Sequence, residues 1–311
     1  MSDFPAPVRP DDLFVQPRRR FQARWWVHLL LFVLTVASTT LLGINHYLVF
    51  VEEFGRRSVT LPIWSVVLQG LIYSGTILGI LGAHEMGHYV ACRYYDIDAT
   101  PPYFLPFPSF AGTLGAVIKI REPFTTRTAL FDIGIAGPIA GFIMIFPALF
   151  IGLHWSTVAP MPHGEGFALG EPLLLKGAIH LAFGSIPDGF TLNIHPMVFA
   201  AWFGMLATSW NLLPFGQLDG GHITYATLGR ASESISVVTV AGAIVMTYIS
   251  VSWLLMTLMM VAMLFLLGRR HPRVIYEHEP LGPGRRWLAV FAVIMFVVCL
   301  IPIPISTATF P

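Results

Sequence analysis

Two histidines and a glutamate lie at a spacing that could bind a metal ion. The chain contains the string His84-Glu85-Met86-Gly87-His88. On a helix, residues four apart share a face, so both imidazoles could bind one ion while Glu85 lies beside an open coordination position. This arrangement is typical of zinc hydrolases, and it predicts a hydrolytic metal site.

A third metal ligand is expected, because catalytic zinc usually has three protein ligands and one open position. The best candidate is Asp219, within residues 211–221 (NLLPFGQLDGG), where a proline and a glycine interrupt a helix. We expect Gly220 and Gly221 to let the backbone pass close to the metal. Asp219 could instead only form a turn ahead of the glycines, and the histidine string could occur by chance on a surface helix.

The residues before the histidine string are apolar enough to cross a membrane. Residues 61–83 contain no charged side chain, and about 20 apolar residues span a bilayer core. The whole chain is 55% hydrophobic and only 11% charged, whereas a soluble domain averages about 25% charged residues. The predicted metal site therefore lies within a membrane, where a cation would offset the cost of a buried carboxylate.

Hydrophobic segments predict an all-α polytopic membrane protein with about seven spans. The expected spans are residues 25–44, 61–90, 129–153, 196–213, 234–250, 253–267 and 287–303. Residues 172–187 are apolar but short and carry Lys176 and His180, so we expect a re-entrant or interfacial helix. Residues 101–121 combine prolines, aromatics and β-branched residues, which predicts a membrane-embedded β-hairpin or loop.

Basic residues predict the orientation of the chain. With the N-terminus in the cytoplasm, all of the 18 lysines and arginines face the cytoplasm except Arg56, Arg57 and Lys176. The expected regions are a cytoplasmic basic tail (1–24), a membrane domain (25–270) with its core at 61–222, a cytoplasmic loop (271–286), and a C-terminal span and tail (287–311). Both halves of the metal site then lie near the cytoplasmic side.

The chain resembles the site-2 protease family of intramembrane zinc metalloproteases. The resemblance rests on HEMGH (84–88), ACRYY (91–95), FDIGIAGP (131–138) and NLLPFGQLDGG (211–221). GTLGAVIKI (112–120) makes it most similar to the branch without a PDZ domain that includes chloroplast-type and bacterial homologues. The resemblance implies that His84, His88 and Asp219 hold one Zn²⁺ per chain and that Glu85 is the general base.

The same resemblance implies that Asn211 holds the substrate carbonyl or its developing oxyanion, although it could instead satisfy backbone groups freed by the helix break. It also implies that the edge of segment 101–121 pairs with an unwound substrate strand. For His222, a role beside the metal ligands or in a gate competes with a purely structural one. Asp132 is interpreted as a charge near a helix N-terminus.

The function expected is hydrolysis of peptide bonds in transmembrane segments of substrate proteins, as in regulated intramembrane proteolysis. Expected partners are the bilayer and a membrane protein such as a pre-cleaved anti-sigma factor or a membrane-tethered regulator; no nucleic acid is expected. The alternatives are a catalytically silent membrane binder of the same fold and an ion or metal transporter. The expected location is a bacterial inner membrane, because three aspartates in the N-terminal tail argue against a transit peptide.

Overall fold

The protein is a bundle of long helices with small two-stranded sheets. The computed structural model describes residues 24–162, 164–267, 274 and 280–310. All of the predicted tail (1–24) except Arg24, and part of the predicted loop (271–286), lie outside the described residues. Within the described part, the helices are α1 (Trp25–Val51), α2 (Ile63–Tyr94), α3 (Arg127–Trp155), α4 (Leu173–Phe183), α5 (Pro196–Asn211), α6 (Asp219–Leu228), α7 (Ala231–Ile249), the 3₁₀ turn η2 (Val251–Trp253), α8 (Leu254–Leu267) and α9 (Pro283–Cys299).

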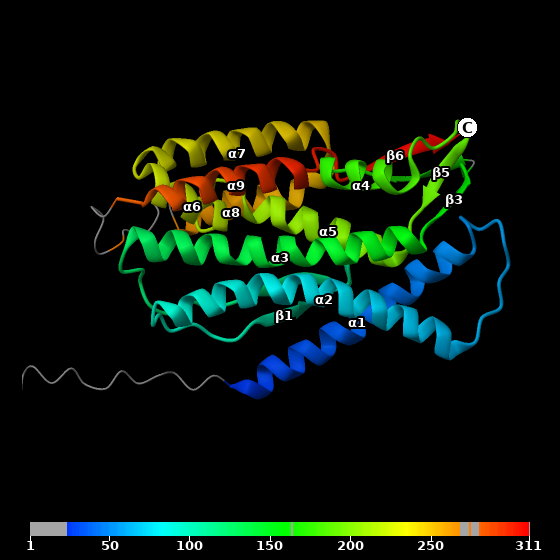
Figure 1. Cartoon of the computed structure of the whole chain (residues 1–311), viewed down its shortest axis with the longest axis horizontal. Helices are drawn as coiled ribbons and strands as arrows, with labels where there is room; N and C mark the ends of the chain where they lie inside the picture. Colours follow the sequence, from blue (N-terminus) through cyan, green and yellow to red (C-terminus); the bar gives the residue numbers. More distant parts are fainter. Residues whose placement is uncertain (1–23, 163, 268–273, 275–279, 311) are drawn as a thin grey trace, which may run out of the picture.

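Six strands form three antiparallel pairs in the described residues. They are β1 (Tyr103–Pro106) with β2 (Thr113–Val117), β3 (Thr157–Pro160) with β5 (Phe190–Asn193), and β4 (Gly164–Leu169) with β6 (Ile305–Phe310). The last two pairs lie together with α4 at one end of the bundle (Figure 1). The β1–β2 pair falls within the segment expected to form a hairpin, and its place in a membrane stays a prediction.

Four of the described helices are long and apolar enough to cross a membrane: α1, α2, α3 and α7. Helices also occupy the other three predicted spans, but α5, α8 and α9 have 16, 14 and 17 residues. A count of seven crossings therefore stays a prediction. The segment expected to be re-entrant or interfacial contains α4, whose 11 residues are too few to cross a bilayer core.

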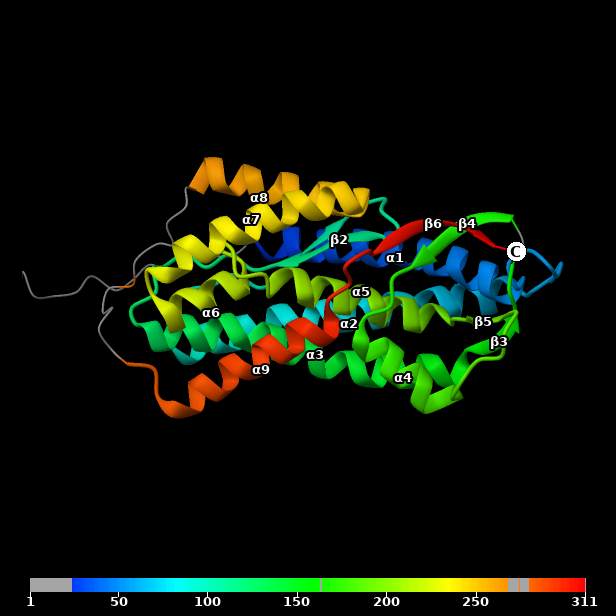
Figure 2. The same ribbon diagram turned by 90° about the horizontal axis from the view of Figure 1, so that it is seen from above.

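The core forms where α2, α3 and α5 pack together. Trp202 of α5, Tyr73 of α2 and Phe131 of α3 are among its largest fully buried side chains. Figure 2 shows α5 running through the middle of the molecule, with α7 and α8 on one side and α3 and α9 on the other. This central position brings the end of α5, and the turn that follows it, against the buried half of α2.

Local sequence explains where the site-bearing helices begin and end. Helix α3 starts after Thr126, whose side chain accepts a hydrogen bond from the backbone N–H of Ala129, as an N-cap residue does. Helix α5 starts with Pro196, which is favourable at a first helical position. It ends at Asn211, three residues before Pro214. The interrupted segment then turns back, and α6 begins at Asp219.

Candidate metal centre

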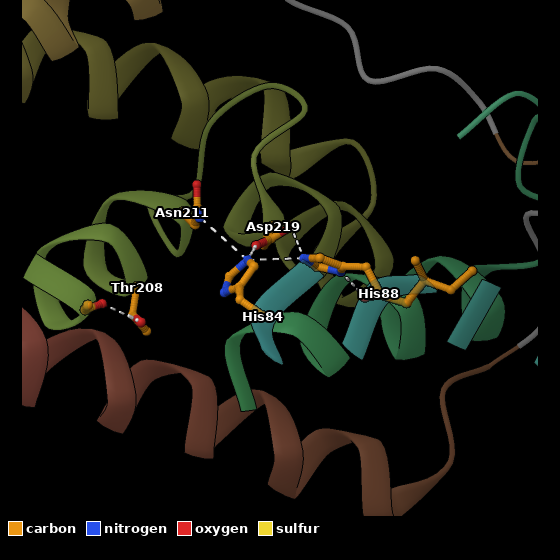
Figure 3. A network of polar contacts seen from close by, with 7 residues as sticks. His84, His88, Thr208, Asn211 and Asp219 are labelled. Atoms are coloured by element: carbon orange, nitrogen blue, oxygen red, sulfur yellow. Dashed lines mark hydrogen bonds and ion pairs between the residues drawn. The ribbon is translucent and has the colours of Figure 1, made fainter. Parts of the chain in front are cut away.

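The structure brings together the three residues predicted as metal ligands. His84 Nε2 lies 3.1 Å from Asp219 Oδ2, His88 Nε2 lies 3.2 Å from Asp219 Oδ1, and the two Nε2 atoms are 3.1 Å apart (Figure 3). Both histidines are buried, and Asp219 is 135 residues from His84 in the sequence. Two distant stretches of chain, α2 and the start of α6, therefore form one cluster.

The spacing of these atoms fits a zinc ion. Bonds of about 2.0–2.1 Å to a tetrahedral ion place the ligand atoms about 3.3 Å apart. The three contacts of 3.1–3.2 Å are close to that separation. Two imidazoles and a carboxylate are also a donor set that zinc prefers. No other group of three or more potential ligands of this kind is found among the described residues.

A backbone carbonyl fixes the orientation of His88. The Nδ1 atom of His88 lies 2.7 Å from the carbonyl oxygen of Ile133 on α3. Because a carbonyl can only accept, Nδ1 carries the hydrogen, and in its neutral form the ring then presents an unprotonated Nε2 to the cluster. Ligand histidines of metal sites are commonly held by such a partner.

Helix α3 approaches the two histidines through glycines. A Cβ atom added to Gly137 would lie 2.1 Å from His88 Nε2, and one added to Gly141 would lie 3.1 Å from His84 Cβ. In the other direction, a Cβ on Gly87 would lie 2.4 Å from the Ala136 carbonyl oxygen. The small residues of FDIGIAGPIAG thus make room for the imidazoles. The sequence motif carried this signal, but its reason becomes visible only when α2 and α3 are packed.

Glu85 lies beside the cluster and is buried. Its side chain has a backbone hydrogen bond from Ile118, directly after β2. Glu85 therefore connects α2 with the residue that follows β2.

Asn211 also faces the cluster. Its Nδ2 lies 3.4 Å from His84 Nε2, at the last residue of α5 (Figure 3). His222, in contrast, lies with its ring against Phe124, at 5.5 Å between centroids, and its Cβ is 3.0 Å from the position of a Cβ on Gly134. The structure therefore places Asn211 beside the three ligands. His222, on α6, packs against α3 and the segment that precedes it.

Two interpretations made from the sequence need correction. Gly220 and Gly221 serve the turn itself, because added Cβ atoms would lie 2.1 Å from the Leu212 carbonyl oxygen and 2.3 Å from that of Gly216. Asp132 is more than a charge near a helix N-terminus, since Arg285 binds its carboxylate. Ile133, Gly137 and Arg285 were all missed as contributors to this region.

Comparisons with known proteins agree with this geometry. The model of peptidase family M50 matches residues 72–258. The probable zinc metalloprotease EGY2, chloroplastic, of Oryza sativa subsp. indica is 33% identical over 175 residues, which cover 54% of this chain and 31% of the relative. The probable zinc metalloprotease EGY1, chloroplastic, of Arabidopsis thaliana is 30% identical over 222 residues, covering 66% of this chain and 40% of the relative.

A relative of another kind is the DDT domain-containing protein PTM of Arabidopsis thaliana, 32% identical over 127 residues, which cover 38% of this chain and 7% of the relative. The chain spans less than half the length of each of these curated relatives. No solved structure matches it. The family model covers more than half of the chain and includes all three residues of the cluster, and on this basis the chain belongs to peptidase family M50.

Proposed function

We propose that this chain is a membrane zinc metalloprotease that cleaves peptide bonds in transmembrane segments of other proteins. The observation that carries the proposal is the cluster of His84, His88 and Asp219 with Glu85 buried beside it. Membership of a peptidase family and the apolar helices around the cluster support it. The names of two relatives, which print zinc metalloprotease, support zinc as the metal.

In this proposal His84, His88 and Asp219 hold the ion. The chemistry that zinc supplies in such a site is Lewis-acid polarisation of a carbonyl and a lower pKa for water. Glu85 takes the proton from the attacking water and delivers it to the leaving amine nitrogen, as a general base and then a general acid. Asn211, with its amide hydrogens beside His84, donates to the oxygen of the scissile carbonyl as negative charge develops on it.

The substrate must be unwound before it is cut, because the amides of a transmembrane helix are engaged in their own hydrogen bonds. An extended segment could pair with an edge of the β1–β2 pair, which lies next to Glu85 through Ile118. We propose a membrane-tethered regulator or a pre-cleaved anti-sigma factor as the substrate class. The distribution of basic residues favours a cytoplasmic N-terminus, and we propose a bacterial inner membrane as the location.

Cleavage of a model transmembrane substrate by purified protein in detergent tests the proposal. We expect about one zinc per chain and cleavage that is lost in Glu85→Gln while zinc is retained. Glu52→Gln, at the opposite end of α1 from the tail, is the matched control and should cleave normally.

Other outcomes would identify the rival functions. Zinc without cleavage of any candidate substrate would favour a silent binder. Metal flux into liposomes would favour a transporter. Cleavage that persists in Glu85→Gln would contradict the role given to Glu85.

A further inference from the structure

Three helical regions meet at one carboxylate beside the metal centre. Arg285, in the first turn of α9, donates from Nε to Asp132 Oδ1 at 2.8 Å and from Nη2 to Oδ2 at 2.7 Å. Tyr95, the residue that follows α2, donates its hydroxyl hydrogen to Oδ2. Asp132 lies in the second turn of α3. One carboxylate therefore joins the end of α2, the start of α3 and the start of α9.

The tyrosine is a permanent donor in this arrangement. Burial, together with the hydrogen bond to Asp132, raises the pKa of Tyr95 to about 12. The hydroxyl therefore keeps its hydrogen throughout the physiological pH range. Arginine is also always charged there. Tyr95 and Arg285 therefore both remain hydrogen-bond donors to the Asp132 carboxylate in this pH range.

Asp132, at the centre of this network, directly precedes Ile133, whose backbone carbonyl orients the metal ligand His88. Ile133, next to Asp132, is buried and its carbonyl oxygen accepts the hydrogen of His88 Nδ1. His88 lies on α2, less than two helical turns before Tyr95. The network thus connects the helix that carries the donor of this hydrogen bond with the helix that carries its acceptor.

The geometry of the ion pair supports an orienting role. The side chains of Arg285 and Asp132 remain 33% and 25% exposed, so solvent screens part of their attraction, but a two-pronged pair within a network is the kind of surface pair that still contributes to stability. A two-pronged arginine–carboxylate contact also imposes a defined geometry. It therefore sets the relative position of the three helices, and the experiment must separate this effect from stability.

Through Arg285 the network also reaches a helix outside the matched family region. Helix α9 begins at Pro283, beyond residue 258, where the match ends. It contacts α3, α5 and α6, which carry the Ile133 carbonyl, Asn211 and Asp219 (Figure 2). The C-terminal helix therefore covers the elements that build the centre and is tied to them by a charged contact.

We propose that Tyr95 and Arg285 are positioning residues that hold His88 in its metal-binding orientation through Asp132, and that Arg285 thereby couples α9 to the metal centre. This inference rests on the proposed function only in requiring that the centre bind zinc. It assigns no contact with substrate to either residue. It does predict that metal affinity depends on a side chain in the C-terminal helix.

The test measures zinc affinity by chelator competition in detergent and the absorption spectrum of the Co²⁺-substituted protein. We expect Arg285→Gln and Asp132→Asn to weaken zinc binding about tenfold, the lower end of the range for residues that orient ligand histidines. Tyr95→Phe should weaken it less, and Arg285→Lys should restore only part of the loss, because lysine lacks the fork. The double variant of Tyr95→Phe and Arg285→Gln should lose less than the product of the single losses, since both act through one carboxylate.

Neighbouring residues supply matched controls. Arg286 follows Arg285 and is exposed, and Tyr94 precedes Tyr95 and is 82% exposed. Arg286→Gln and Tyr94→Phe should leave zinc affinity and the cobalt spectrum unchanged. Melting temperatures are measured in parallel for every variant.

The outcomes separate this inference from the proposed function. Zinc affinity and a cobalt spectrum equal to those of the unmodified protein in Arg285→Gln would overturn the inference and leave the proposed function standing. A lower melting temperature with unchanged zinc affinity would assign the network to stability alone and would also overturn it. Absence of zinc binding by the unmodified protein would overturn both.

Discussion

The polar side chains of the metal centre differ in their hydrogen-bond partners. His88 is fixed by the Ile133 carbonyl on its far side, whereas the ring of His84 has Asp219 and Asn211 as partners on the near side. Asn211 is not required to complete the three-ligand set. Its amide is therefore available to a substrate, and its loss should affect the reaction more than the metal.

Replacing Asn211 by alanine separates these two roles. We expect kcat to fall by about 10²–10³, as for removal of one donor to an oxyanion, with zinc content unchanged. Thr208→Val is the control, because the Thr208 hydroxyl donates within its own helix, to the Gly204 carbonyl. Steady-state kinetics and zinc analysis measure the effect. Equal loss of zinc and activity would show that Asn211 supports the metal instead.

Burial of His195 should make the stability of the folded protein depend on pH, independently of the metal centre. It precedes α5, and its ring lies against those of Phe50 and Trp155. Burial lowers the pKa of His195 to about 4 from 6.5. Between these values the unfolded chain binds a proton that the folded chain does not, so stability should fall as the pH drops from about 6.5 to 4.

The His195→Asn variant tests that assignment. Asparagine is also a good N-cap residue, so it can replace the acceptor that His195 offers to the Met197 backbone N–H. We expect a lower melting temperature at neutral pH, from lost ring packing, and a weaker decline on acidification. A decline as steep as that of the unmodified protein would place the responsible group elsewhere.

At the scale of elements, the contact between α2 and α3 decides whether the centre forms. Gly137→Ala should abolish stoichiometric zinc binding, because the added methyl would fall 2.1 Å from His88 Nε2. Gly79→Ala on α2 is the control, since no atom lies within 4 Å of its added Cβ. Alanine there should raise helix stability by about 0.5–1 kcal/mol. Zinc analysis and melting temperatures give the comparison, and full zinc content in Gly137→Ala would contradict this packing.

The sequence predicts those residues of the site that stand in a recognisable local pattern. The i, i+4 histidine pair shows in spacing alone, and Asp219 shows as an acidic residue at an interrupted apolar segment. The structure confirms that these residues meet. The family resemblance pointed to Asn211, which the structure places beside them.

The remaining contributors depend on packing between distant elements. Ile133 acts through a backbone carbonyl, which every residue has, so its side chain gives no signal. In the sequence, Arg285 is one of many basic residues assigned to the cytoplasmic side. Its partner Asp132 lies 153 residues away, so no local pattern indicates the pairing. Among the elements, each of the seven predicted spans contains a helix, but only four of the helices in the described residues have the length and composition to cross. Short helices such as α5 are defined by proline and by their neighbours rather than by bilayer thickness.

At the scale of the whole molecule, the two ends of α2 should face opposite sides of a membrane if the proposed orientation is right. Arg57, shortly before α2, and Arg93, in its last turn, are both exposed and suit labelling. Cys92 and Cys299 are fully buried, so they should give little background. In right-side-out vesicles, we expect a membrane-impermeant maleimide to label Arg57→Cys but not Arg93→Cys. Labelling of both from one side would contradict the orientation.

The central claim is that α2 and α6 together hold one zinc ion through His84, His88 and Asp219. X-ray absorption at the zinc edge of the purified protein tests it most directly. We expect about one zinc per chain with nitrogen and oxygen ligands at about 2.0–2.1 Å, two imidazole signatures and no sulfur. In Asp219→Ala the ion should be lost or its spectrum changed. A sulfur-containing shell, or a spectrum that Asp219→Ala leaves unchanged, would contradict the claim.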